Sequence, residues 1–253
     1  MTLLNIVKNA LKPGHLPVML DKVIKRIKEP HLKRDKRLAT KWCSEMAEDT
    51  EDYLSSIDSQ LLKEAVAFNE ELHIHGKEVI KSLPFKMGGG GNCVLIYFLT
   101  RYKKPETVVE TGVSMGFSSY AFLHAMKLNE RGRLFSSDFP YFRHLEPERF
   151  VGCVVPEDYK SDWQLFINGD KENLKEILPK IGLIDIFHYD SDKSYEGRSF
   201  VFEAISKHLS GQALIIFDDI HDNLHFRDLV EQHKFNYKVL SSYNGGFVGL
   251  IML

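Results

Sequence analysis

Short apolar runs alternate with amphipathic segments along the C-terminal two thirds of the chain, after a run of four glycines at 88–91. Apolar runs of this length between turn residues are typical of strands buried on both faces of a parallel sheet. We predict such strands at 107–110, 133–137, 163–167, 184–189 and 213–217. Helical segments at 118–128, 171–178 and 197–209 are suited to the crossovers between them.

The pattern changes at the C-terminal end, where two strand-like runs, 237–241 and 247–253, flank the short Asn244-Gly245-Gly246 turn. A connection this short leaves no room for a helix, so the two runs predict an antiparallel hairpin. The fold class is therefore α/β, with a Rossmann-like seven-stranded sheet of five parallel strands plus the hairpin, and helices on both faces.

Residues 1–85 form a charged region with helical periodicity. Apolar residues at Val18, Val23 and Ile27 recur at helical spacing, and a second helical stretch runs from about 56 to 80. We predict two parts, a helical extension over 1–85 that serves as a lid or an oligomer contact, and a cofactor-binding domain over 86–253. A homo-oligomer would form through the N-terminal helices.

Composition excludes several classes of protein. The 253 residues carry 33 Lys and Arg against 35 Asp and Glu, so no overall charge attracts nucleic acid or an anionic membrane. The cysteines Cys43, Cys93 and Cys153 lack disulfide or zinc spacing, which favours a reducing compartment. We expect a cytoplasmic protein that acts on a small molecule, with no nucleic-acid or membrane partner.

A glycine-rich turn follows the first predicted strand, in Glu110-Thr111-Gly112-Val113-Ser114-Met115-Gly116. Glycines let the backbone approach a ligand closely, and the helix that follows presents free N–H groups. Asp138 ends the second strand, where a carboxylate can accept both hydroxyls of a ribose, and Asp170 follows the third, where it can accept the adenine amino group. Each acid alone is as well explained as a helix cap, but their order favours nucleoside binding.

Carboxylates also follow the fourth and fifth strands, as Asp190 and Asp192 and as the pair Asp218-Asp219. Acids that converge on one sheet edge repel each other unless a proton or cation neutralises them, and hard oxygen ligands suit Mg²⁺ or Ca²⁺. The alternative is that one or two of them cap the following helices. A divalent cation, with Mg²⁺ favoured, is the predicted second cofactor.

The motifs VVETGVSMGFSS, GRLFSSD, INGD, HYDSDKSYEG and IIFDDIHDN resemble the class I S-adenosylmethionine (SAM)-dependent methyltransferases, over roughly residue 88 to the end. Ser114 stands where a dinucleotide-binding loop usually has glycine, which argues against NAD. The resemblance implies that the chain binds SAM, with Glu110 beginning the glycine motif beside the methionine part. The predicted cofactor-binding residues are Glu110, Gly112, Ser114, Gly116, Ser118, Asp138, Asp170 and Asp190.

The acidic motifs further resemble the metal-dependent O-methyltransferases, including catechol O-methyltransferase and the sugar- and antibiotic-tailoring enzymes. That resemblance implies metal binding by Asp190, Asp218 and Asp219. It also implies a catalytic lysine at Lys193, whereas related D-x-x-H-x-Y proteins have histidine there. His221 is the second candidate base, and His188, inside the fourth strand, is better explained as structural.

These observations together predict a SAM-dependent O-methyltransferase for a hydroxyl of a sugar, polyketide or other secondary metabolite, assisted by Mg²⁺. Two alternatives remain open. One is a hydroxylase-like relative on the same fold, because the cephalosporin hydroxylase-like proteins resemble this acidic pattern and a fold does not determine a reaction. The other is a noncatalytic SAM-binding protein.

Overall fold

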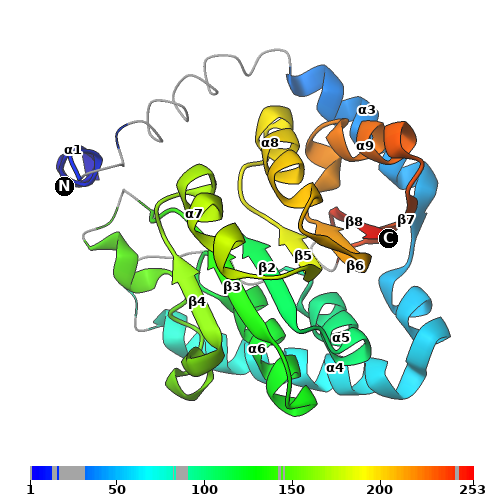
Figure 1. Cartoon of the computed structure of the whole chain (residues 1–253), viewed down its shortest axis with the longest axis horizontal. Helices are drawn as coiled ribbons and strands as arrows, with labels where there is room; N and C mark the ends of the chain where they lie inside the picture. The colour runs from blue at the N-terminus through cyan, green and yellow to red at the C-terminus, as the bar shows by residue number, and fades with distance from the viewer. Residues whose placement is uncertain are drawn as a thin grey trace.

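The computed structural model of the chain forms three layers, with a central sheet between two layers of helices (Figure 1). It describes residues 2–12, 16, 32–81, 83, 91–141, 144, 146–242 and 245–253. The helix predicted around 18–27 and the glycines at 88–90 lie outside these residues. Within the described part, no helix is both long and apolar enough to cross a membrane.

The sheet has eight strands in the order β1-β7-β8-β6-β5-β2-β3-β4. Their bounds are β1 Ala47–Glu48, β2 Thr107–Thr111, β3 Arg133–Ser137, β4 Trp163–Phe166, β5 Ile184–Tyr189, β6 Leu209–Phe217, β7 Asn236–Ser241 and β8 Phe247–Met252. Strands β2 to β6 are parallel, and β8 pairs antiparallel with both β6 and β7. The predicted fold class, five parallel strands followed by an antiparallel hairpin, is confirmed.

Two features of the sheet differ from the prediction. Strand β6 begins at Leu209 rather than at residue 213, with an irregularity in its register against β5. The short β1 adds an eighth strand, parallel to β7, from the region predicted to be only helical. Two residues are too few for an alternating pattern to appear in the sequence, so β1 depends on the exposed edge of β7.

One face of the sheet is covered by α4 Thr50–Lys81, α5 Cys93–Lys103 and α6 Phe117–Asn129, which lie together at the bottom of Figure 1. Helix α5 is apolar nearly all round, with eight consecutive buried residues from Cys93 to Thr100, because it is enclosed by the sheet, α4 and α6. Helix α4 contains a break at Asp58, whose carboxylate accepts the backbone N–H groups of Gln60 and Leu61 as a helix N-cap does.

The other face is covered by α3 Leu32–Met46, α7 Asp170–Ile177, α8 Tyr195–Ser206 and α9 His225–His233. Short 3₁₀ helices at Pro147–Phe150 (η2), Glu157–Asp162 (η3), Leu178–Lys180 (η4) and Ile220–Asp222 (η5) lie in the connections. Helix α3 contacts η5, and α4 shares the main core with β2 and β5. The N-terminal region therefore completes both helical layers, while its role as a lid or oligomer contact stays a prediction.

Helix α1 (Thr2–Ala10) lies apart from the other helices, at the left of Figure 1. The Asn9 amide donates to the carbonyl oxygen of His144, and the Lys12 ammonium pairs with Glu148. The first residues of the chain thus contact the connection between β3 and β4, which borders the carboxyl edge of the sheet.

Candidate cofactor and catalytic site

The loop between β2 and α6 has three residues with positive φ: Gly112 at 89°, Ser114 at 49° and Gly116 at 94°. This conformation suits glycine and is strained for Ser114, whose side chain is exposed. Gly116 also lies against Gly152, since a Cβ built on Gly116 would be 2.8 Å from the Cα of Gly152. The predicted glycine turn is a tight loop that is exposed at Ser114 and closely packed at Gly112 and Gly116.

Gly112 is where this loop meets the loop that follows β5. A Cβ at Gly112 would lie 2.4 Å from the carbonyl oxygen of Asp190, and the Asp190 N–H donates to the Thr111 carbonyl oxygen at 2.7 Å. Only glycine allows the two backbones to approach this closely. The predicted cofactor loop and the first of the predicted metal ligands are therefore in direct contact.

Glu110 is completely buried beneath the glycine loop. Its carboxylate accepts hydrogen bonds from the hydroxyls of Ser118, Ser119 and Ser136, at 2.6 Å from Ser119 and 2.8 Å from Ser136. His188 of β5 lies 3.6 Å away, and although burial lowers the pKa of this histidine, Glu110 outweighs that effect and raises it. Glu110 thus links the start of α6, through Ser118 and Ser119, to β3, through Ser136.

Asp138 follows β3 and lies beside the glycine loop. Its carboxylate accepts the N–H groups of Val113 at 3.0 Å, Ser114 at 2.5 Å and Phe139 at 2.5 Å. Burial, with the charge of Asp170, raises the pKa of Asp138 to about 6, although the three hydrogen bonds oppose the shift. A carboxylate at the end of the second parallel strand, next to the exposed part of the loop, is placed as a ribose-binding acid must be.

Asp170 begins α7 after β4 and accepts hydroxyl hydrogen bonds at 2.6 Å from both Ser137 and Ser191. It therefore connects the end of β3 to the loop after β5. These contacts bring Asp170 to the same edge as Asp138, as predicted. Binding of adenine by Asp170 stays a prediction.

The acids after β5 and β6 meet around one lysine. The Lys193 ammonium pairs with Asp190 and lies 3.0 Å from Asp219 Oδ2. Burial lowers the pKa of Lys193, but the charges of Asp190, Asp219 and Asp218 outweigh burial and raise it, so Lys193 is positively charged. Across the described residues, no three His, Cys, Asp or Glu side chains are arranged as a metal site.

Asp218, the third predicted metal ligand, is buried and has fixed partners. Its Oδ1 accepts the side-chain amide of Asn92 at 2.9 Å and the N–H of Asp219 at 3.0 Å. Burial and the Asp190 charge raise the pKa of Asp218 to about 6. Sequence reasoning missed Asn92, because its contact with Asp218 spans 126 positions of the chain; the one signal was its place directly after the glycine run.

Arg198 is a second residue that sequence reasoning missed. It is 1% exposed on α8, and its Nη2 donates at 3.0 Å to the carbonyl oxygens of both Asp218 and Asp219. Asp219 has a φ of 50°, so the backbone that carries the acid pair is strained, and Arg198 holds it in place. A charged residue in the middle of an amphipathic segment gave no sign that its side chain points inward.

His221 lies at the end of the site next to the C-terminal hairpin. A Cβ built on Gly246 would be 2.9 Å from its Cε1 and 3.6 Å from Asp219 Oδ1, so the ring and the carboxylate flank the same glycine. The His221 Nδ1 is buried and has no hydrogen-bond partner among the residues that the structure describes. The fold thus brings both candidate bases, Lys193 and His221, next to Asp219.

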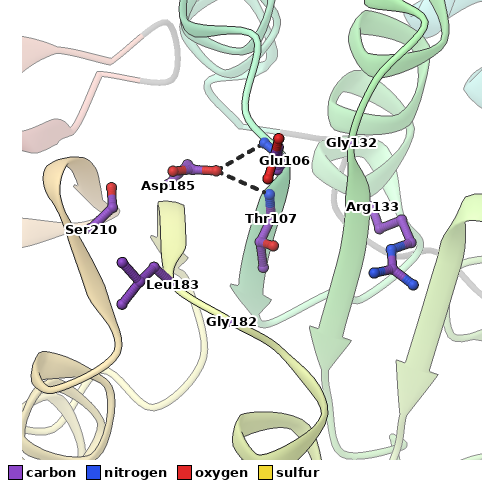
Figure 2. Close-up of a pocket in the computed structure, with 8 residues that line it drawn as sticks. All are labelled: Glu106, Thr107, Gly132, Arg133, Gly182, Leu183, Asp185 and Ser210. Carbon is purple, nitrogen blue, oxygen red and sulfur yellow. Dashed lines mark hydrogen bonds between the residues drawn. The ribbon is translucent and has the colours of Figure 1, made fainter.

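A pocket at the opposite edge of the sheet contains none of the predicted cofactor-binding, metal-binding or catalytic residues. Figure 2 shows Asp185 in it, accepting backbone N–H hydrogen bonds from Glu106 at 2.8 Å and from Thr107 at 3.2 Å. Its other lining residues are Gly132, Arg133, Gly182, Leu183 and Ser210. The pocket lies at the amino ends of the parallel strands, and the fold places every predicted site residue at the carboxyl ends.

The family model described as methyltransferase domain matches residues 109–220. This segment runs from β2 to η5 and includes every predicted cofactor and metal residue from Glu110 to Asp219. The resemblance to SAM-dependent methyltransferases is confirmed over this segment, and the chain carries a methyltransferase domain. A comparison with curated proteins gave no match.

Solved structures share the fold. A methyltransferase from Geobacter sulfurreducens is 21% identical with a TM-score of 0.50, over 75% of this chain and 90% of that one. The O-methyltransferase from Bacillus cereus, in complex with S-adenosylhomocysteine (SAH), is 14% identical with a TM-score of 0.53, over 80% and 96%. TomG from Streptomyces achromogenes, in complex with SAM, is 13% identical with a TM-score of 0.52, over 87% and 97%.

The contact between Gly112 and Asp190 yields a test of the site's framework. We expect Gly112→Ala to lower the free energy of unfolding by about 1–3 kcal/mol, because it combines an unfavourable φ with a backbone clash. Thermal and urea denaturation measure the change. Gly211→Ala is the control, since a Cβ there meets nothing within 4 Å; an equal effect of the two substitutions would contradict the close approach.

The role of Arg198 is tested by Arg198→Met. The substitution removes two hydrogen bonds to the Asp218 and Asp219 carbonyl oxygens, and we expect a loss of about 1–3 kcal/mol in unfolding free energy. Arg131→Met, which breaks an exposed pair with Glu106, should cost less than about 1 kcal/mol. Urea denaturation of both variants measures the difference, and an unchanged Arg198→Met midpoint would contradict the role.

Proposed function

We propose that the protein is a SAM-dependent O-methyltransferase that acts on a hydroxyl group of a small molecule. The observation that carries the proposal is the contact between two halves of one site. One half is the glycine loop with Asp138, which has the features of a nucleoside-binding site. The other half is Lys193 with the acids Asp190, Asp218 and Asp219. The two halves meet where Gly112 approaches the backbone of Asp190. Both lie within the matched methyltransferase domain.

The cofactor half is supported by the partners of its residues. The loop N–H groups of Val113 and Ser114 point at Asp138, so the carboxylate already lies against the exposed part of the loop. Ribose hydroxyls donate hydrogen bonds, and the two oxygens of an ionised carboxylate accept them. We infer that Asp138 binds the ribose, that Asp170 lies toward the adenine, and that Gly112 and Ser114 border the methionine part.

Methyl transfer from the sulfonium of SAM is a direct displacement, in which the acceptor oxygen forms a bond to the methyl carbon as the carbon–sulfur bond breaks. The protein must align the two reactants and remove the hydroxyl proton. The Lys193 ammonium is held in its charged form, which suits stabilising the negative charge that develops on the acceptor oxygen. The ring of His221, with an unpartnered Nδ1 beside Asp219, suits taking the proton.

A divalent cation stays part of the proposal only through the type of donor atoms present, because the side chains that the structure describes are not arranged as a metal site. Asp190, Asp218 and Asp219 supply hard carboxylate oxygens. Lys193 pairs with Asp190 and Asp219, and the Arg198 guanidinium lies against the backbone of Asp218 and Asp219. These three residues would hold the ion. When bound, the ion would ligate the acceptor hydroxyl and lower its pKa.

The acceptor is a small hydroxylated compound, for which sugars and polyketides are the classes that we expect. The loop after β3 and the segment after Asp219 border the site. The contacts of Asn9 with His144 and of Lys12 with Glu148 place the N-terminal segment beside the loop after β3. These segments are the expected source of acceptor specificity. The protein is expected to act in the cytoplasm.

Binding of SAH tests the cofactor site and its pH dependence. The pKa of Asp138 is raised to about 6, so the carboxylate is ionised and able to accept ribose hydroxyls above that pH and is protonated below it. We expect SAH affinity to be constant between pH 7 and 8 and to fall about tenfold for each pH unit below about 6. Isothermal titration calorimetry over this range measures it.

Asp138→Asn is the matched variant for the same titrations, because it keeps the size of the side chain and removes the charge. Its SAH affinity should be at least about tenfold weaker at pH 7.5 and should not change further as the pH falls. Asp185→Asn, at the opposite edge of the sheet, serves as the control. Failure of the wild-type protein to bind SAH at any pH would overturn the proposed function.

The proton-accepting role of His221 is tested by turnover. SAM is offered with a panel of catechols, sugars and polyketide alcohols, and release of SAH is measured. We expect His221→Gln to lower kcat about 100-fold or more, while SAH affinity stays the same. His233→Gln, which alters a histidine stacked on Phe235 away from the site, should leave turnover unchanged. Unchanged turnover in His221→Gln would return the role to Lys193.

A further inference from the structure

Residues 152–155, in the connection between β3 and β4, lie along the glycine loop, and we name them the bracing segment. The Gly152 N–H donates to the Ser114 carbonyl oxygen at 2.9 Å, and the Val154 N–H donates to the Met115 carbonyl oxygen at 2.9 Å. Two consecutive carbonyl groups of the loop are therefore fixed by the bracing segment.

Ser114 is the residue of the loop that most needs this support. Its φ of 49° is unfavourable for serine, and such a conformation persists only where the surrounding structure fixes it. Its N–H donates to Asp138 at 2.5 Å, while its carbonyl oxygen accepts the Gly152 N–H. A shift of the bracing segment would therefore also move an N–H group that orients the Asp138 carboxylate.

Helix α4 holds the bracing segment in turn. The Nε2 of His75 lies 2.8 Å from the Val154 carbonyl oxygen, and because a carbonyl group only accepts, this ring nitrogen is the donor. Val154 is completely buried, with its N–H bonded to the glycine loop and its carbonyl oxygen bonded to His75. One residue thus connects α4 to the loop through its two backbone groups.

The residue after His75 brings α4 against the other end of the loop. A Cβ built on Gly76 would lie 2.4 Å from the ring of Phe117, the first residue of α6. Glycine at this position lets α4 approach the start of α6 closely. Two adjacent residues of α4 therefore contact the bracing segment and the helix that the glycine loop leads into.

We propose that His75 is a positioning residue for the cofactor site: its hydrogen bond to Val154 fixes the bracing segment, which fixes the glycine loop in the conformation that binds SAM. This inference rests on the proposed function, since it assigns the loop to SAM. His75 acts through the backbone of Val154. Part of the N-terminal region then serves cofactor binding, a role separate from that of a lid or an oligomer contact.

Titration of SAH into the full-length protein at pH 7.5 tests the proposal by calorimetry. We expect His75→Leu, which removes the donor, to weaken SAH binding about fivefold or more. His75→Gln should restore the affinity to within about twofold of the wild type, because its amide N–H can donate to the same carbonyl oxygen. Thermal unfolding of the same samples shows that each variant is folded.

His73→Leu is the matched control on the same helix. The ring of His73 lies beside Phe117, with centroids 5.8 Å apart, but its Nδ1 bonds to the Asn69 carbonyl oxygen of α4 itself. Its substitution should leave SAH affinity unchanged. An equal loss of affinity in His73→Leu, or in His75→Gln, would overturn the role of the His75 hydrogen bond.

Hydrogen–deuterium exchange in the absence of SAH gives a second test that needs no ligand. Residues 112–116 should exchange faster in His75→Leu than in the wild type, because the loop opens more often when the bracing segment is not held. Unchanged exchange there would overturn the proposal. Failure of the wild-type protein to bind SAH would instead count against the methyltransferase function, and faster exchange in His75→Leu would still show that His75 holds the loop.

Discussion

The approach of Gly112 to the Asp190 carbonyl oxygen is the contact on which the rest of the site depends. Parallel strands β2 and β5 are neighbours in the sheet, so the loops that leave their carboxyl ends start close together. Any side chain at position 112 would force them apart. Because they stay together, a loop suited to a nucleoside and a loop that carries acids form one site rather than two.

Buried negative charge is the second constraint, and the protein meets it differently in each half of the site. The Glu110 carboxylate accepts hydrogen bonds from three internal serine hydroxyls and lies near His188, so it links β2, β3 and α6. Asp138 is held by three backbone N–H groups, which leaves it beside the exposed part of the loop. Asp190 and Asp219 instead pair with the partly exposed ammonium of Lys193. Glu110, whose partners are all internal, therefore supports the structure, whereas Asp138 and the acids beside Lys193 are placed where they can bind a ligand.

The matched methyltransferase domain and the fold both indicate a SAM-dependent methyltransferase, as the residues of the site do. The matched segment ends at Ile220, so His221 and the C-terminal hairpin, which we propose to border the acceptor, lie outside it. The N-terminal segment with α1 also lies outside the matched segment, although Asn9 and Lys12 contact the connection between β3 and β4. Substrate choice is expected to come from these outer parts.

The sequence by itself determined the sheet and the order of the acids along it. Strand and helix positions were predicted to within a few residues, because buried parallel strands are apolar runs and their crossovers are amphipathic, and both patterns are local. The carboxyl ends of parallel strands share one edge, so Asp138, Asp170, Asp190 and Asp218 could be placed there in advance. Only the tertiary structure decided what each acid contacts. Asn92, just before α5, binds the Asp218 carboxylate across 126 positions of the chain, and Arg198 of α8 binds the Asp218 carbonyl oxygen. Lys193 pairs with two of the acids that predicted a metal. These pairings depend on distances in the folded core that no local pattern contains.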